Sequence, residues 1–451
     1  MDNLTRVISE YAAGLSFDEL PSAVRTAATH CMVDTLACAV GAYQCEQATI
    51  ARSLVRGAVP EHLPGRILGY AERTTAESAA FVNTAMIRNL DFNDEYPGGH
   101  PSDCLGAFLG IADSAAVDGQ RLLSSLVVAY ELFLTLNDAT HLREKGWDQG
   151  FLIGLSTTAG LGHLLRLPVA SLAEALAITA VANVPMRNSR AGALSLWKGA
   201  ATAFATRNAV FATLLASRGM TGPDRPFEGK HGLWDLITGP FELAALGGRG
   251  GPYRTPDVRL KYWPVEYNAQ LVIWAALELR GKVAWQDLAQ VDVGTYTFAY
   301  TEIGSEPEKW DPRTRETADH SLPYLFARTL IDGDMTLAAF EEAAFLDPAL
   351  RPLMNKIKVR IDPEVDANYP GTVSMQVHAQ TKDGREVVLT PQDPLGHIKN
   401  PMQGDDIRKK FLNTVEPVLG PERAAKALDR WWNLQKIKDL GKAISLLDLE
   451  S

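Results

Sequence analysis

Ionisable side chains crowd one short segment, residues 90–103, whose sequence is LDFNDEYPGGHPSD. Four acids and one histidine lie within it: Asp91, Asp94, Glu95, His100 and Asp103. The first three are spaced three and four residues apart, so on a helix they would share a face, where mutual repulsion raises the pKa of a carboxyl group. A carboxylate and an imidazole so close together favour general acid–base catalysis by Asp91 and His100.

Two other interpretations of this segment stay open. One is a capped loop whose acidic face is solvated and has no catalytic role. The other is a metal site of two carboxylates and a histidine, which we rank lower because closed metal sites usually draw a further His or Cys, and none is obvious. Ser102 is predicted to cap the following helix, with Asp103 in its first turn, which would place His100 at the start of a helix.

A lysine occupies an unusual position in the helix predicted over SLWKGAATAFATRNAVFATLLASRG. Ser195 suits the N-cap and Gly219 the position after the last turn, so Lys198 lies three residues after the cap, where Glu or Gln is usual. A cation there opposes the helix dipole, at a cost of a few tenths of a kcal/mol to about 1 kcal/mol. An anion bound by Lys198 and the first-turn N–H groups would explain that cost, with Arg187 and Arg190 as further candidates. An exposed lysine with its ammonium in water is the alternative.

A third candidate lies in ETADHSLPYLFARTLIDG, where His320 precedes Ser321 and Tyr324 at the start of a predicted helix. This pattern also caps many inert helices, so by itself it indicates little. The sequence has no P-loop, GxSxG or HExxH motif, and the glycine-rich LGGRGGP does not follow a predicted strand. Nucleotide binding is therefore not predicted.

The elements that must position these residues fall into two classes. Helical periodicity dominates up to about residue 265, and GFLIGLSTTAGLGHLLRL predicts a central helix whose small residues allow close packing. Strand patterns follow, including a hairpin through Lys382 and Gly384, before helical spacing returns after Asp405. We therefore predict a mainly α protein with an α+β second domain: a helical domain from residues 1–265 and 401–451, and an inserted α+β domain over residues 266–400.

The composition is that of an ordinary globular protein, with 46% hydrophobic and 22% charged residues among 451. The formal net charge of −10, without a large basic cluster, argues against nucleic-acid binding. The N-terminus does not resemble a signal peptide, and no uninterrupted apolar run reaches about 18 residues. We therefore expect a cytoplasmic protein without membrane association, in which an anionic substrate would need a local positive pocket.

Six sequence blocks resemble the MmgE/PrpD family, which includes 2-methylcitrate dehydratase, cis-aconitate decarboxylase and iminodisuccinate epimerase. They follow the family's order: LDFNDEYPGGHPSD, SLWKGAATAFA, GMTGPDRPFEGKHGL, KYWPVEYNAQ, ETADHSLPY and GHIKNPM. The resemblance covers nearly the whole chain. It implies a homodimer with a large helical domain and a smaller α+β lid, an active site in the cleft between them, and no required cofactor.

The same resemblance implies roles for individual residues. The family's active-site residues match Asp91, His100, Lys198 and Tyr324. Candidate residues for binding the substrate are Gln149, Asn268, Arg187, Arg190, Lys261, His320 and Ser321.

Two positions depart from the family pattern. Relatives carry a histidine in a GWDH-like turn, where this chain has GWDQ with Gln149, and another in a PAEFHAQ-like segment, where it has PVEYNAQ with Asn268. An amide can orient a carboxylate or hydroxyl group but cannot take a proton at neutral pH. Proton transfer must therefore depend on fewer groups.

The chemistry common to the family forms a carbanion-like centre beside a carboxylate, which needs a base, a proton donor and cations. We predict that His100 is the main general base or acid and that Asp91 orients it. Lys198 would hold a substrate carboxylate, and Tyr324 would donate to the leaving group. The leading function is a lyase that dehydrates a hydroxylated di- or tricarboxylate of the 2-methylcitrate type.

Three alternatives to dehydration remain. An isomerase or epimerase comes next, because reversible proton abstraction needs no leaving group and tolerates the missing histidines. A decarboxylase acting on a polycarboxylate is third. A catalytically inactive binding protein is less favoured, because the chain retains Asp91, His100 and Lys198 together.

Overall fold

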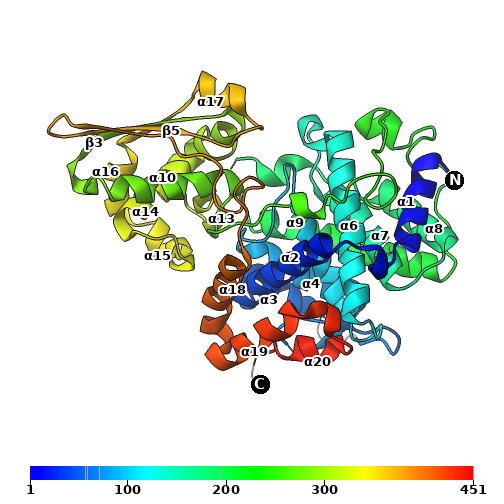
Figure 1. Ribbon diagram of the computed structural model, residues 1–451. Helices are drawn as coiled ribbons and strands as arrows, with labels where there is room; N and C mark the ends of the chain where they lie inside the picture. Colours follow the sequence, from blue (N-terminus) through cyan, green and yellow to red (C-terminus); the bar gives the residue numbers. More distant parts are fainter. Residues whose placement is uncertain (56, 58, 71, 193, 450–451) are drawn as a thin grey trace. The chain divides into compact units, whose positions relative to one another are not determined.

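The computed structural model describes the whole chain except residues 56, 58, 71, 193 and 450–451 (Figure 1). The chain forms two compact units. Unit 1 comprises residues 1–189, 199–258 and 403–451, and unit 2 comprises residues 190–198 and 259–402. The protein is mainly helical with a small mixed sheet in unit 2, which confirms the predicted mainly α class with a mixed second part.

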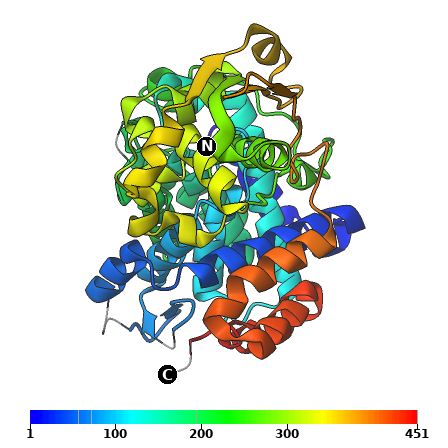
Figure 2. The same ribbon diagram turned by 90° about the vertical axis from the view of Figure 1, so that its left-hand side faces the viewer.

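Unit 1 is built from helices contributed by both ends of the chain. They are α1 (Asn3–Gly14), α2 (Ser22–Gly41), α3 (Glu46–Val55), α4 (Ala76–Asn89), α5 (Leu105–Ile111), α6 (Gly119–Thr140), α7 (Gly150–Leu164), α8 (Val169–Ala182), most of α9 (Trp197–Ser217), α18 (Gly404–Leu419), α19 (Pro421–Trp432) and α20 (Leu440–Ser445). The C-terminal α18 packs alongside the N-terminal α2 (Figure 2). The buried Lys410 of α18 forms an ion pair with Asp34 of α2 at 2.5 Å and donates to the main-chain oxygen of Phe92 at 2.7 Å.

The predicted tightly packed helix is confirmed as α7, all of whose residues are buried. It packs against α6, α8 and α5. A side chain at Gly160 would place its Cβ 2.3 Å from the ring of Phe108 and 3.0 Å from the main-chain oxygen of Ser125. Glycine is therefore needed there for the neighbouring helices to approach.

One described helix, α6, is long and apolar enough to cross a membrane by length and composition alone. However, 83% of its most apolar window is buried inside the protein. Its buried Glu131 accepts hydrogen bonds from the main-chain N–H groups of Arg254 and Thr255 and from the Thr255 hydroxyl. These features are typical of a core helix rather than a membrane span.

Unit 2 contains a four-stranded sheet in the order β4-β3-β5-β6. The strands are β3 (Leu288–Thr295), β4 (Ile357–Ile361), β5 (Gln376–Thr381) and β6 (Glu386–Leu389). The β3–β4 pair is parallel and the other two pairs are antiparallel. The predicted hairpin is confirmed as β5–β6, with Gly384 in the left-handed region at φ 86°. Helices α10 (Gln270–Arg280) and α14 (Leu322–Asp332) pack together and lie on one side of the sheet (Figure 1).

The helix that carries Lys198 differs slightly at its start from the prediction. α9 begins at Trp197, and Ser195 contributes its carbonyl oxygen, which accepts from the Lys198 N–H at 2.9 Å. Lys198 is thus the second helical residue rather than the third after a serine cap. At the other end Gly219, with φ 92°, forms the predicted C-terminal turn, in which the N–H of Met220 donates to the oxygen of Leu215.

Candidate active site

The acidic segment of unit 1 is a loop, because α4 ends at Asn89 and Asp91 has a φ of 47°. The predicted helical face shared by Asp91, Asp94 and Glu95 is therefore wrong. A positive φ is unusual for aspartate and is held only where surrounding contacts fix it. Strained backbone conformations are common at functional sites, so the conformation of Asp91 supports a functional role for this loop.

The glycines of the loop allow it to lie close against two helices. Tyr96 and Gly99 exchange main-chain hydrogen bonds of 2.9 and 2.8 Å and form a tight turn. A Cβ on Gly98 would lie 2.1 Å from Oδ1 of Asn137, and one on Gly99 would lie 2.0 Å from Oε1 of Gln149. Larger residues would push the loop away from α6 and from the start of α7.

The imidazole of His100 has a defined tautomer. Its Nδ1 lies 2.6 Å from the main-chain oxygen of Asp94, and a carbonyl oxygen only accepts, so Nδ1 carries the proton. In the neutral ring Nε2 is consequently the basic nitrogen, and it lies 3.9 Å from Oδ1 of Asp91. The side chain of His100 is 12% exposed, and its main-chain N–H donates to Oε1 of Gln149 at 2.6 Å. The structure therefore brings Asp91, His100 and Gln149 together.

Asp91 is held by a buried polar network. Arg88, at the end of α4, donates from Nη1 to Oδ1 of Asp91 at 3.0 Å and to Oδ1 of Asn93 at 2.9 Å. The amide of Asn93 donates to Ser102 and to Asp103. Such a network fixes the position of each carboxylate more firmly than isolated bonds would.

Asp94 is the second buried carboxylate of the loop. It accepts from the N–H and the hydroxyl of Ser102 at 3.1 and 2.5 Å and from the hydroxyl of Tyr130 at 2.6 Å. Burial raises the pKa of Asp94 to about 7, and these hydrogen bonds partly oppose that rise. The prediction that Ser102 caps the next helix is wrong, since its hydroxyl serves Asp94 and His100 takes the N-cap position without a side-chain hydrogen bond.

In unit 2, Lys198 is buried beside an acid and a histidine. Its Nζ lies 3.1 and 3.3 Å from the two carboxylate oxygens of Asp319 and 3.2 Å from Nδ1 of His320. Nδ1 of His320 lies 2.5 Å from Oδ1 of Asp319, which is fully buried. Lys309 is nearby, and burial, together with the charge of Lys198, lowers its pKa. The ammonium of Lys198 is thus anchored in place by a carboxylate.

Asn268 is engaged on both sides of its amide. Its Nδ2 donates to Oε1 of Glu266 at 2.6 Å, and its Oδ1 accepts from the hydroxyl of Tyr296 at 2.6 Å. The Tyr296 ring stacks on Tyr369. Asn268 is therefore tied to the core of unit 2.

Two residues of the ETADHSLPY block, Ser321 and Tyr324, make structural contacts within unit 2. Ser321 caps α14, accepting from the N–H of Tyr324 at 3.2 Å, and its hydroxyl donates to the oxygen of Lys309. The hydroxyl of Tyr324 donates to the oxygen of Ala339, and its ring belongs to the hydrophobic core of unit 2. Burial raises the pKa of Tyr324. Donation by Tyr324 to a leaving group would require this buried bond to break.

The three remaining residues predicted to bind the substrate are Lys261, Arg187 and Arg190, and they do not all belong to the same unit. Lys261 is fully buried in unit 2. Arg187 lies in unit 1, where its N–H donates to the oxygen of Gly146, whereas Arg190 groups with unit 2. Neither arginine is fully buried.

Sequence reasoning missed three residues that organise these clusters: Arg88, Asn93 and Asp319. Arg88 and Asn93 hold the loop carboxylates, and Asp319 holds Lys198. The indication for Asp319 was available, because it directly precedes His320 and a buried acid beside a histidine commonly orients the ring.

Comparison with known proteins matches both halves of the chain. Residues 6–245 match the MmgE/PrpD N-terminal domain, and residues 263–434 match the MmgE/PrpD C-terminal domain. The chain belongs to the MmgE/PrpD family. This confirms the family predicted from the six sequence blocks.

Curated relatives of this MmgE/PrpD protein are similar over most of its length. A 2-methylcitrate dehydratase of Cupriavidus necator is 27% identical, covering 90% of this chain and 86% of the relative. A 2-methylcitrate dehydratase of Escherichia coli strain K12 is also 27% identical, covering 84% and 83%. A cis-aconitate decarboxylase of Aspergillus terreus is 25% identical, covering 99% and 96%. The protein is thus an enzyme of the lyase or dehydratase type.

Proposed function

We propose that the protein is a lyase that removes water from a hydroxylated di- or tricarboxylate of the 2-methylcitrate type. The observation that carries this proposal is the arrangement of His100. Its Nδ1–H is directed to a carbonyl oxygen, so Nε2 is the nitrogen that takes a proton. Relatives named as 2-methylcitrate dehydratases, similar over more than four-fifths of the chain, support dehydration as the reaction.

In the proposed step, Nε2 of His100 takes the proton from the carbon beside a substrate carboxylate. The electron pair of that C–H bond forms the C=C bond, and the C–O bond on the neighbouring carbon breaks. The proton held by His100 can return to the departing oxygen, which leaves as water. Asp91, 3.9 Å from Nε2, stabilises the imidazolium that forms in between.

Lys198 is proposed to bind a substrate carboxylate in the same reaction. Its ammonium is held in position by Asp319, so little side-chain freedom is lost when an anion binds. A fixed cation stabilises the enolate-like charge without rearranging as that charge develops.

Epimerisation or isomerisation is the second candidate, and the two amides favour it. Oε1 of Gln149 accepts from the main chain of His100, and Asn268 is bonded to Glu266 and Tyr296. Neither position supplies a base, so the chemistry rests on few proton-transfer groups. Reversible proton abstraction has no leaving group that must be protonated.

Proton NMR in deuterated water with a panel of hydroxy- and amino-polycarboxylates tests the proposal. Dehydration gives a new alkene signal, epimerisation gives deuterium exchange without loss of water, and decarboxylation removes a carboxylate. We expect the alkene signal with a 2-methylcitrate-type substrate. Exchange alone would replace dehydration by the second candidate.

The variant that tests the base is His100→Asn. The asparagine nitrogen can occupy the place of Nδ1 and donate to the Asp94 carbonyl, but nothing replaces Nε2. We expect turnover to fall by at least 10³-fold, in the range typical of a lost general base, with the folded state retained. His378→Asn is the matched control, because His378 is exposed on β5. Full activity of His100→Asn would refute the assignment.

We also propose that the protein is a homodimer. Exposed aromatic side chains follow one face of α9, where Phe204 and Phe211 are seven residues apart and 42% and 53% exposed. Apolar surface of this kind often marks an interface between proteins. Light scattering after gel filtration tests this, with Phe211→Asp expected to shift the mass from a dimer towards a monomer.

A further inference from the structure

Unit 1 contains a pocket that is lined by several basic side chains. None of its described lining residues belongs to the loop of residues 90–103. The volume of the pocket is about 590 Å³. It is formed by the segment before β1 (Gly65–Arg66), the turn after α5, the start of α6 and the C-terminal ends of α7 and α9. Its lining includes Arg121, Arg166, Arg218 and His62, and none of the described residues that line it is acidic.

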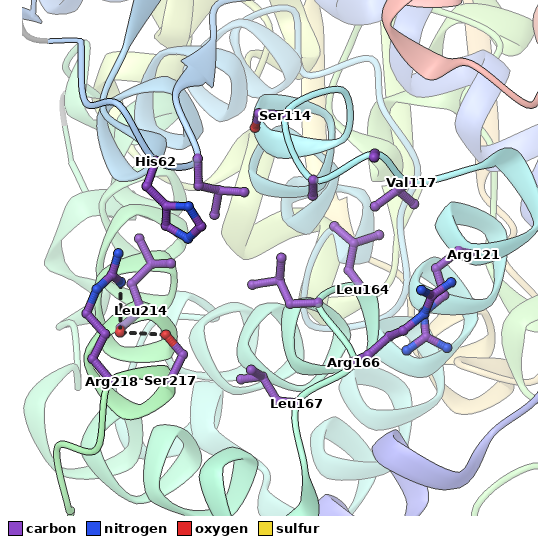
Figure 3. A pocket seen from close by; sticks show the side chains of 14 residues that line it. His62, Ser114, Val117, Arg121, Leu164, Arg166, Leu167, Leu214, Ser217 and Arg218 are labelled. Atoms are coloured by element: carbon purple, nitrogen blue, oxygen red, sulfur yellow. Dashed lines mark hydrogen bonds between the residues drawn. The ribbon is translucent and has the colours of Figure 1, made fainter.

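The basic side chains lie on two sides of an apolar surface (Figure 3). Arg121 and Arg166 lie together on one side. Burial lowers the pKa of Arg121 to about 10, the charge of Arg166 contributes to that lowering, and the charge of Asp118 partly opposes it. His62 and Arg218 lie on the other side in this view. Leucine side chains, including Leu164, lie between the two groups. Two like charges held together and partly removed from water are costly, and Asp118 offsets this cost only in part because it does not line the pocket.

Two of the arginines also have a structural role. Arg121 donates to the main-chain oxygen of His163, and Arg218 donates to that of Leu214 at 3.3 Å. Both oxygens lie near helix C-termini, where cations are favourable. These hydrogen bonds alone would explain the presence of arginine side chains at Arg121 and Arg218.

Arg166 is not explained in this way. Its side chain makes no hydrogen bond or ion pair with any residue in the described part of the chain. It has a φ of 56° at the end of α7, where the N–H of Leu167 donates to the oxygen of Gly162. That is the left-handed position after a helix, which glycine fills without strain. The corresponding position after α9 is indeed Gly219. An arginine at a position that favours glycine points to a use for its charge.

We propose that this pocket is a second ligand site, which takes an organic dianion with an aliphatic middle. One anionic group would contact Arg121 and Arg166, the other would contact His62 and Arg218, and the aliphatic segment would cover the leucines. Carboxylate and phosphate groups share the required charge and acceptor oxygens.

Calorimetric titration of the full-length protein with three probes tests the proposal. Octanedioate carries two carboxylates on an aliphatic chain, octanoate carries one, and inorganic pyrophosphate has no aliphatic part. We expect saturable binding of octanedioate, at least tenfold weaker binding of octanoate, and weaker binding again of pyrophosphate. Equal affinity for octanedioate and octanoate would refute the requirement for two anionic groups. Tightest binding of pyrophosphate would refute the requirement for an aliphatic segment.

The decisive variant is Arg166→Gly. Glycine relieves the strained backbone, so we expect a rise in melting temperature of about 1–3 °C, together with at least a tenfold loss of octanedioate affinity. A purely structural arginine would not give this combination, and unchanged affinity would overturn the site. Arg207→Gln is the matched control, because Arg207 is exposed on α9 and does not line the pocket.

Octanedioate also resembles the proposed substrates, so the two sites must be distinguished. Lys198→Met is expected to retain octanedioate binding, because Lys198 does not line the pocket. Loss of binding in Lys198→Met, with affinity retained in Arg166→Gly, would assign the ligand to the catalytic residues and overturn the second site. Neither result depends on whether the enzyme is a dehydratase or an epimerase.

Discussion

The buried carboxyl group of Asp94 should make the stability of the protein depend on pH. Its pKa is raised by burial from 3.8 to about 7. Well below pH 3.8 the group is protonated in both the folded and the unfolded chain, so it contributes nothing. As the pH rises, the unfolded chain ionises first, and the folded state pays a growing penalty until the pH passes about 7. Replacing Asp94 by Asn removes that penalty.

The size of the effect follows from the two pKa values. The difference between a pKa of about 7 in the folded chain and 3.8 in the unfolded chain destabilises the folded state by roughly 2 kcal/mol at pH 5 and roughly 4 kcal/mol at pH 8. The substitution also disturbs the bonds from Ser102 and Tyr130, but that effect does not vary with pH and cancels in the difference. We therefore expect the free energy of unfolding of Asp94→Asn, relative to that of the wild type, to increase by about 2–3 kcal/mol when the pH is raised from 5 to 8.

Urea denaturation at both pH values, followed by circular dichroism, measures this difference. Asp429→Asn serves as the control, because Asp429 is exposed on α19. We expect the control to follow the wild type at both pH values. A difference between wild type and Asp94→Asn that stays constant within about 0.5 kcal/mol would refute the protonation of Asp94 in the folded protein.

Two further variants separate structural from catalytic roles in unit 2. Tyr324→Phe removes the donor to the oxygen of Ala339, so we expect a loss of about 1–2 kcal/mol in urea denaturation and little change in kcat; a hundredfold fall in kcat would assign the hydroxyl to catalysis. Lys198→Met leaves Asp319 buried and unpaired with that lysine, so we expect about 3–5 kcal/mol of destabilisation and loss of turnover. Adding Asp319→Asn should restore most of the stability but none of the activity, and recovery of activity would show that Lys198 acts only through the fold.

The fold was predictable where the determinants are local. Small residues at close spacing identified α7, Gly219 identified the end of α9, and Gly384 identified the hairpin of β5 and β6. Each depends on the steric properties of a few neighbouring residues. The sequence contains such information directly.

The details of the candidate site were not predictable, because distant residues determine them. Ser102 would be a natural helix cap, but the carboxylate of Asp94 competes for its hydroxyl and is itself bonded to Tyr130, 36 residues away. Similarly, Gln149 meets the main chain of His100 across 49 residues. The local preference of a serine for a helix cap contributes less free energy than the hydrogen bonds that a buried carboxylate needs.

The same contacts explain why histidine chemistry fits this loop. Two main-chain groups position His100: the Asp94 carbonyl accepts from the ring, and its own N–H donates to Gln149. Main-chain positions in a loop are fixed only when the loop itself is fixed. Here Gly98 and Gly99 allow close packing, and the carboxylate of Asp94 binds the loop to Ser102 and Tyr130. These hydrogen bonds are donated to Asp94 and favour its ionised form, so protonation of Asp94 weakens the anchoring, and the catalytic ring then loses its orientation together with the loop. The pH dependence of stability and that of turnover should then share the titration of Asp94, although the proton transferred belongs to His100.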